Sequence, residues 1–230
     1  MKTIERPPTL VTTAAKNIRD EIVRGGLLPG EPLHEVELSN MLNISRGTVR
    51  EALRLLQQEG YVDVIPYRGA FVVKLTPGKV KEIYTLRALL EPYAVRLCLE
   101  NKAFSQEMIA ELKDLVKHLG ELEQSGDYAE TIATDIKFHT LISQPSKHSL
   151  LLDVLTNLQS QTLMLILNTK LYHSDMVPDD VSHQAILDGI LSGNPDTAEQ
   201  VVRQHVMDAG SSLLKRMEEI DWEKEYLTYK

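Results

Sequence analysis

The sequence predicts a mainly α-helical protein in two parts, of which the smaller N-terminal part also contains a β-hairpin. Apolar residues recur at helical spacing in nine segments along the chain. Two short apolar or alternating runs, 61–65 and 70–74, are typical of strands, and the Pro-Gly segment 75–78 separates the two parts. At 230 residues, the chain is long enough to form two modest hydrophobic cores.

Three helices are expected in the N-terminal part. They cover residues 14–23, residues 35–42 and the segment from Ser45 to a break at Gly60. The first helix stops at Gly25-Gly26, and the sequence LLPGEPL that follows is typical of a turn. Two short helices, a turn and a third helix have the order of a helix-turn-helix motif.

The third of these helices has the pattern of a DNA recognition helix. Ser45 can cap its N-terminus, and Arg46 and Arg50 lie at its exposed start. Its apolar stripe consists of Val49, Ala52, Leu53 and Leu56. Such a stripe would fix the helix to its own domain while the arginines face a DNA groove. An amphipathic surface helix with two solvated arginines is the alternative.

The strands 61–65 and 70–74 would form a hairpin. The turn between them is Pro66-Tyr67-Arg68-Gly69, which places a basic residue at its tip. A basic hairpin after a helix-turn-helix is the wing of a winged helix-turn-helix domain.

The distribution of charge agrees with a local DNA contact surface. The net charge is −8, but residues 1–74 hold ten Lys/Arg against nine Asp/Glu, whereas residues 75–230 hold fifteen against twenty-four. The arginines of the third helix and the wing would contact phosphates, although the asymmetry could arise by chance. Neither a membrane-spanning run nor a secretory signal is evident, and the single Cys98, best explained as a buried apolar residue, suits a cytoplasmic protein.

Residues 22–73 resemble the winged-helix domain of the GntR family of bacterial transcription regulators. The matching motifs are GxLxPGExL from Gly26, LxxxLNISRxxVREALxxL from Leu38, EGYV from Glu59 and PYRGAFV from Pro66. Val36 departs from the pattern, because some members carry a DNA-contacting arginine there. The resemblance implies that Ser45, Arg46, Thr48, Arg50, Arg68 and Gly69 contact an operator.

The C-terminal part reads as an all-helical bundle. Six helices are expected, over residues 79–101, 105–125, 127–143, 148–173, 178–192 and 195–219. Ser125-Gly126-Asp127 and Gly193-Asn194-Pro195 supply helix stops and caps. We therefore expect a DNA-binding domain over 1–75, a linker over 76–79, an effector-binding and dimerisation domain over 80–220 and a tail over 221–230.

Four potential metal ligands lie on apolar stripes of these helices, namely Asp135, His139, His183 and His205. Burying such groups without partners would cost several kcal/mol each. An aspartate with three neutral imidazoles suits zinc, nickel or another divalent cation such as manganese, with positions left for a ligand. A plain hydrogen-bonded pair of Asp135 and His139 is the alternative for that helix. His118 falls off its apolar stripe.

Residues 79–215 resemble the FCD effector domain of the FadR-type branch of the GntR family. The motifs are LRxLLE from Leu86, DxxFH from Asp135, HxxIL from His183 and the histidine of RQHV from Arg203. Six helices rather than seven resemble the VanR-type subgroup. The resemblance implies a metal site, most simply zinc, in a sensor domain for small molecules.

Arg87 lies on the apolar stripe of the first C-terminal helix. A buried guanidinium there would bind the carboxylate of an effector in bidentate fashion. The alternative is an ion pair with Glu91, four residues later on the same helix.

These observations predict a cytoplasmic, homodimeric, ligand-responsive transcription regulator. It would bind a palindromic operator in double-stranded DNA and sense a small organic acid at a metal-containing site, without enzymatic activity and without a membrane partner. A metal-dependent enzyme with an attached DNA-binding module is the main alternative. A third possibility is an architectural DNA-binding protein whose helical part only dimerises.

Overall fold

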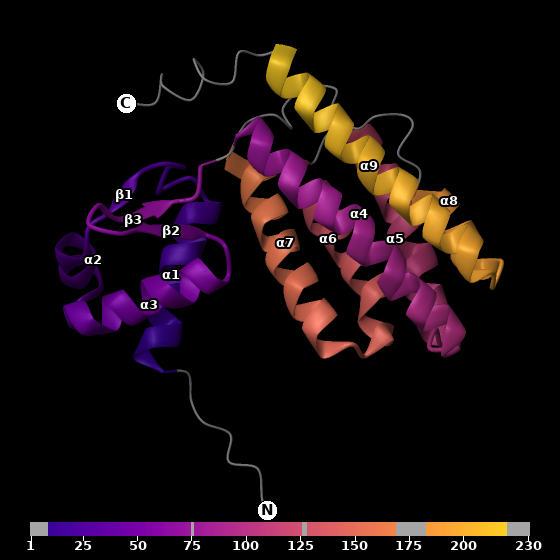
Figure 1. Cartoon of the computed structure of the whole chain (residues 1–230), viewed down its shortest axis with the longest axis horizontal. Coiled ribbons are helices and arrows are strands. Elements are labelled where there is room, and N and C mark those ends of the chain that lie inside the picture. Colours follow the sequence, from indigo (N-terminus) through magenta and orange to yellow (C-terminus); the bar gives the residue numbers. More distant parts are fainter. Residues whose placement is uncertain (1–8, 75, 126–127, 169–182, 220–230) are drawn as a thin grey trace, which may run out of the picture. The chain divides into compact units, whose positions relative to one another are not determined.

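The computed structural model describes residues 9–74, 76–125, 128–168 and 183–219. The chain divides into two compact units, residues 1–75 and 76–230. Figure 1 shows that the first unit combines helices with a small sheet and that the described part of the second is helical. None of the helices in the described ranges combines the length and apolar character that crossing a membrane requires.

Over residues 9–74, the N-terminal unit contains three helices and three strands. In chain order they are α1 (Leu10–Val23), β1 (Pro32–Leu33), α2 (Glu35–Leu42), α3 (Arg46–Gln58), β2 (Val62–Ile65) and β3 (Gly69–Val72). The strands form an antiparallel sheet in the order β1-β3-β2, in which Asp63 lies opposite Phe71. The sequence prediction missed β1, which it assigned to a turn, because two residues pairing with the distant Ala70 and Phe71 leave no local periodicity.

Helix caps and one apolar core stabilise the fold of the N-terminal unit. Helix α1 starts earlier than its apolar stripe, at Leu10, because the Thr9 side chain accepts a hydrogen bond from the Thr12 backbone N–H. The predicted stripe of α3 is buried, and α3 packs against α1, whose buried residues include Ala15, Ile18 and Ile22. The core therefore holds α3 by one side and leaves its polar side exposed.

Within its described residues, the C-terminal unit contains six helices, each overlapping a predicted one, and one additional 3-10 turn. They are α4 (Pro77–Glu100), α5 (Gln106–Ser125), α6 (Tyr128–Ser143), η1 (Gln144–Ser146), α7 (Ser149–Asn168), α8 (His183–Leu191) and α9 (Pro195–Glu219). Asn194 accepts hydrogen bonds from the first N–H groups of α9, as its sequence predicts. The predicted cap at 126–127, the helical residues 169–173 and 178–182, and the tail 221–230 lie outside the described residues.

Helices α4 and α9 pack closely along much of their length. Gly210 of α9 makes this approach possible, because a Cβ atom there would lie 2.7 Å from the side chain of Tyr84 on α4. A core from α4, α5, α6, α8 and α9 fills the bundle, with Val95, Leu112, Phe138, Ile186 and Val202 among its residues. This packing brings one face of α6 toward α4, α8 and α9, where the polar residues described next lie.

Candidate functional site

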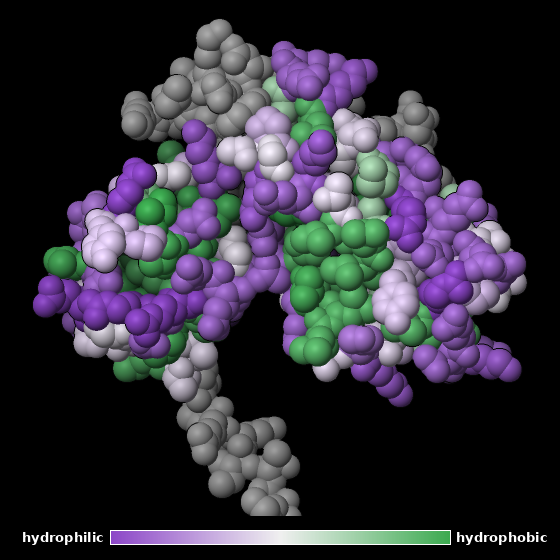
Figure 2. Space-filling model, in the orientation of Figure 1, coloured by the Kyte–Doolittle hydropathy of each residue, from purple (hydrophilic) through white to green (hydrophobic). Residues whose placement is uncertain are grey.

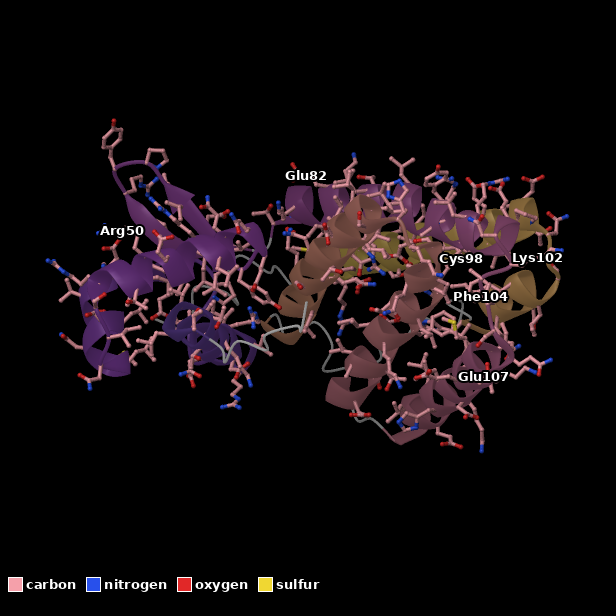
Figure 3. All side chains as sticks on the ribbon, turned by 90° about the horizontal axis from the view of Figure 1, so that it is seen from below. Arg50, Glu82, Cys98, Lys102, Phe104 and Glu107 are labelled. Carbon is pink, nitrogen blue, oxygen red and sulfur yellow. The ribbon has the colours of Figure 1, made fainter. Side chains whose placement is uncertain are left out.

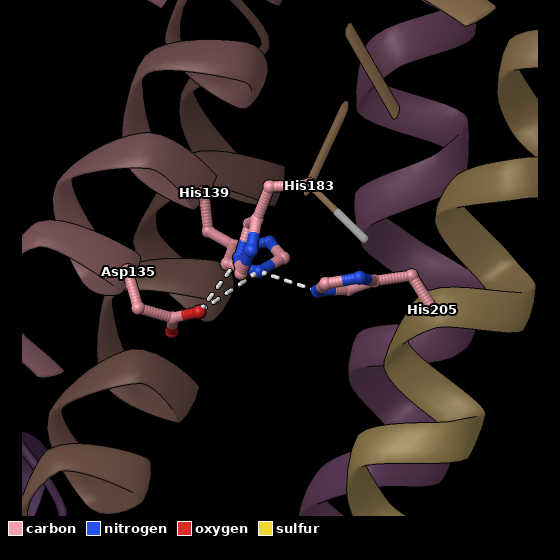
Figure 4. Close-up of side chains that lie close together, drawn as sticks. All are labelled: Asp135, His139, His183 and His205. Carbon is pink, nitrogen blue, oxygen red and sulfur yellow. Dashed lines mark hydrogen bonds and ion pairs between the residues drawn. The ribbon is translucent and has the colours of Figure 1, made fainter. Parts of the chain in front are cut away.

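The four residues that the sequence proposes as metal ligands come together inside the C-terminal unit (Figure 4). Asp135 and His139 lie four residues apart on α6, His183 is the first residue of α8, and His205 lies in the middle of α9. One potential ligand atom from each residue lies within 4.8 Å of all the others. His139 and His205 are buried, and Asp135 and His183 are partly buried.

Two of the distances between these atoms match those in the coordination shell of one cation. Asp135 Oδ1 lies 2.9 Å from His183 Nε2 and 3.7 Å from His139 Nε2, and the Nε2 atoms of His139 and His205 lie 3.2 Å apart. A cation with bonds of about 2.0–2.1 Å separates neighbouring ligand atoms by about 3.0 Å at right angles and about 3.4 Å in a tetrahedron. The donor set and its geometry therefore suit a divalent transition metal.

A buried carboxylate contacts one of the four candidate ligands, His139. Glu91 of α4 is fully buried, and its Oε2 atom lies 2.6 Å from Nδ1 of His139. Its other oxygen accepts a hydrogen bond of 2.6 Å from Nε of Arg87, which is also buried. Sequence reasoning considered Glu91 only as a partner of Arg87. The contact with His139, 48 residues later, depends on the packing of α4 against α6 and has no local signal.

The protonation states of Glu91, Asp135 and His205 depend on the groups around them. Burial alone would raise the pKa of Glu91, but the positive charge of Arg87 and the contact with His139 lower it to about 2. Burial opposes the charge of Asp135 as well, yet His139 and His183 hold the pKa of that carboxyl far below its ordinary value. Burial, with the neighbouring His139 and His183, lowers the pKa of His205 well below that of a free imidazole. Two carboxylates and a neutral His205 therefore coexist in the site.

The structure contains the ion pair that was the alternative explanation for Arg87. Besides donating to Glu91, the guanidinium lies 5.1 Å from the ring centre of Tyr84. Its burial inside the bundle near Asp135 also places a fixed positive charge beside the candidate metal ligands.

The predicted DNA-contacting residues gather at one end of α3 and on the hairpin. The hydroxyl of Ser45 accepts a hydrogen bond of 3.1 Å from the Thr48 backbone N–H, so Ser45 caps α3 as predicted. Arg46 and Arg50 are exposed on the first turns of the helix (Figure 3 labels Arg50). The fold does not require these two arginines to be buried, so both side chains can contact a bound macromolecule.

Arg50 has a partner that sequence reasoning missed. Its Nε and Nη2 atoms donate to the two carboxylate oxygens of Glu35 on α2, at 2.9 and 2.7 Å. Half of the Arg50 side chain, 55%, remains exposed in this arrangement. The bidentate pair holds the guanidinium in one orientation on the outside of the helix-turn-helix.

The hairpin turn carries the remaining candidates. Arg68 is exposed, with its guanidinium 5.9 Å from the ring centre of Phe71, and Gly69 has a φ of 104° that favours glycine. Tyr67, which sequence reasoning did not select, stands fully exposed at the tip with a φ of 63°. A basic residue and an aromatic ring therefore project from the wing.

Comparison with known proteins agrees with both units. Residues 10–72 match the family model described as bacterial regulatory proteins of the gntR family, and residues 82–208 match the FCD domain. The chain is 29% identical over 201 residues to a "Probable D-xylose utilization operon transcriptional repressor" of Paenarthrobacter nicotinovorans, which covers 85% of this chain and 86% of the relative. It is 27% identical over 213 residues to the HTH-type transcriptional repressor RspR of Escherichia coli strain K12, covering 89% and 90%.

Solved structures show the same architecture. A putative GntR transcriptional regulator from Rhodococcus sp. RHA1 superposes with a TM-score of 0.72 at 25% identity, covering 89% of this chain and 97% of the other. E. coli McbR/YncC superposes with a TM-score of 0.70 at 21% identity, covering 91% and 99%. The families and relatives are transcription regulators and not enzymes, which excludes the metal-dependent enzyme considered above. This chain belongs to the GntR family of bacterial regulatory proteins, in the branch whose C-terminal part is an FCD domain.

Proposed function

We propose that this transcription regulator binds a palindromic operator as a homodimer in the cytoplasm and responds to a small organic acid held partly by a metal ion. The observation that carries the proposal is the convergence of Asp135, His139, His183 and His205 from three helices on one place inside the bundle. A regulator has no structural need to bury four such groups together, because apolar residues would pack the same space at lower cost.

The donor set favours zinc, with nickel or manganese as further candidates. Three imidazoles and one carboxylate match the nitrogen and oxygen ligands of these ions. When bound, the ion would supply a positive centre with positions open to an oxygen ligand. The contact with Glu91 leaves Nε2 of His139 directed at the other ligands, and Nδ1 of His205 has no hydrogen-bond partner among the described residues.

The balance of buried charge supports a carboxylate as effector. Asp135 and Glu91 contribute two negative charges, Arg87 contributes one positive charge, and a divalent ion would leave one positive charge in excess. A buried excess charge is costly unless it is paired, and a carboxylate would supply the missing negative charge. Arg87 would attract this carboxylate while keeping its contact with Glu91.

The N-terminal unit would read the operator with the residues that lie at the start of α3 and on the wing. We propose that Arg46 and Arg50 contact base edges and phosphates and that Ser45 and Thr48 position the helix on the DNA backbone. Arg68 and Gly69 would approach the minor groove or the phosphates beside it. The exposure of these residues and the capped start of α3 support this arrangement.

An apolar surface on the C-terminal unit supports a homodimer. Helices α4 and α7 pack together and present the exposed side chains of Leu86, Leu89, Tyr93, Leu150 and Val154. Figure 2 shows a continuous hydrophobic area over these two helices. Apolar areas of this kind mark protein interfaces, and a second copy of the chain is the partner that a palindromic operator requires.

The effector and the operator would influence each other through the dimer. If the effector changes the affinity for DNA, the operator must change the affinity for the effector by the same factor.

The DNA assignment predicts the behaviour of Arg50→Ala. The variant should bind an operator selected from random-sequence DNA about ten- to hundredfold more weakly at matched salt, because a side-chain contact with the DNA is lost. Arg24→Ala removes the same charge from an exposed position at the end of α1 and should keep nearly full affinity. Fluorescence anisotropy measures both, and wild-type affinity in Arg50→Ala would refute the assignment.

The metal assignment predicts that the four ligands behave as a unit. Alanine at Asp135, His139, His183 or His205 should each remove most of the metal that co-purifies with the chain, as measured by elemental analysis. His118→Ala is the matched control, because this histidine is 45% exposed. If His183→Ala and His205→Ala retain full metal, or if His118→Ala loses it, the four-residue site is wrong.

The dimer assignment predicts the effect of charge on the apolar surface. The double variant Leu89→Asp with Leu150→Asp should sediment as a monomer at micromolar concentration, because both side chains are more than half exposed in one chain and would be buried in the dimer. Leu191→Asp places the same change on an exposed leucine of α8 and should leave the dimer intact. A dimeric double variant would contradict the proposed surface.

Because His205 is buried, we expect the stability of the metal-free protein to depend on pH. The pKa of His205 is lowered in the folded state, whereas in the unfolded chain it is about 6.5. The unfolded chain therefore binds the proton first, and the contribution of His205 to the free energy of unfolding is present above about pH 6.5 and is lost as the pH falls. Urea unfolding in chelator should show this decline, and His205→Gln should flatten it. An equal decline in the variant would contradict the assignment.

A further inference from the structure

We propose that Glu91 is a positioning residue for the candidate metal site, where it fixes the proton of His139 on Nδ1 and directs Nε2 toward the other ligands. Arg87 in turn holds Glu91. The proposal rests on the metal site proposed above, but it concerns residues outside the ligand set.

The contacts determine which nitrogen of His139 carries the proton. Glu91 Oε2 lies 2.6 Å from Nδ1, and an ionised carboxylate can only accept a hydrogen bond. In a neutral imidazole, Nδ1 is therefore the donor, and Nε2 keeps a free lone pair. This Nε2 atom lies 3.2 Å from Nε2 of His205 and 3.7 Å from Oδ1 of Asp135, so the lone pair points into the cluster.

Arg87 makes a buried carboxylate possible at this position. Its Nε donates to Oε1 of Glu91 at 2.6 Å, which leaves Oε2 for His139. Glu91 is 0% exposed, and a carboxylate in such a place would be protonated without a compensating charge. Arg87, Glu91 and His139 thus form a chain from α4 to α6 in which each member orients the next.

A second Arg–Glu pair lies on the same helix, where Arg96 contacts Glu100 and also Asp196 and Glu199 of α9. Arg96 and Glu100 have the same spacing as Arg87 and Glu91, at a distance of 3.3 Å, but Glu100 is exposed. No histidine contacts Glu100 among the described contacts. An i,i+4 ion pair therefore does not by itself require burial. The burial of Glu91 is explained by its second contact, since metal-bound histidines commonly donate their other N–H to a carboxylate.

Zinc titration of the chelator-treated full chain tests the proposal. Glu91→Gln should lower the affinity for Zn²⁺ about ten- to hundredfold, the usual effect of losing such a partner. Glu91→Asp keeps the charge beside Arg87 but is one methylene shorter, and it should also weaken binding. Glu100→Gln, the matched control on α4, should bind Zn²⁺ like the wild type. Unchanged affinity in both Glu91 variants would overturn the proposal.

A measurement on the wild type decides the question even if a Glu91 variant does not fold. In metal-free protein at about pH 8, where a free imidazole is neutral, ¹⁵N chemical shifts should show His139 with its proton on Nδ1. A proton on Nε2 would overturn the proposal, because that nitrogen would then not face the site as a ligand. Failure of the wild type to bind Zn²⁺ would instead refute the metal site itself, so the two failures are distinguishable.

Discussion

The C-terminal unit depends on one constraint, which is that every charge buried in its core needs a partner. Asp135 pairs with His183, and Glu91 pairs with both Arg87 and His139. These contacts join α4, α6 and α8, and the contact between His139 and His205 adds α9. A charge left without its partner would cost several kcal/mol, so the network favours one register of the four helices. The same contacts gather imidazole nitrogens and a carboxylate oxygen, which are the kinds of atom that a divalent cation would bind.

The two units use charged residues in opposite ways. In the N-terminal unit the core is apolar and holds α3 by its stripe, while the arginines stay outside, where DNA can reach them. Even there one guanidinium is oriented, because Glu35 holds Arg50 through two hydrogen bonds. In the C-terminal unit Arg87 and Glu91 are buried and Asp135 is partly buried, and we propose that these charges attract a small ligand. A fixed outward-facing surface and an inward-facing polar site suit a regulator that binds DNA and responds to a metabolite.

Most of the fold and of the candidate site could be predicted from the sequence, because apolar residues recur at regular spacing along the chain. Helical spacing placed Asp135 and His139 on one face of α6 and put His183 and His205 on apolar stripes. The resemblance to the FCD domain then implied that these four residues share one metal site. The contacts of Glu91 with His139 and of Glu35 with Arg50 could not be predicted in this way. Each joins residues on different helices, and their distance depends on how those helices pack. Strand β1 was missed for the same reason, because its two residues gain their conformation only from pairing with β3.

X-ray absorption spectroscopy at the zinc edge of the Zn²⁺-loaded full chain tests the central claim most directly. The account predicts a shell of nitrogen and oxygen atoms at about 2.0–2.1 Å that contains three imidazoles and no sulfur. A sulfur ligand would implicate Cys98, whose buried thiol has its pKa raised to about 12 and is a poor metal ligand. A shell with sulfur, or with fewer than three imidazoles, would contradict a site built from Asp135, His139, His183 and His205.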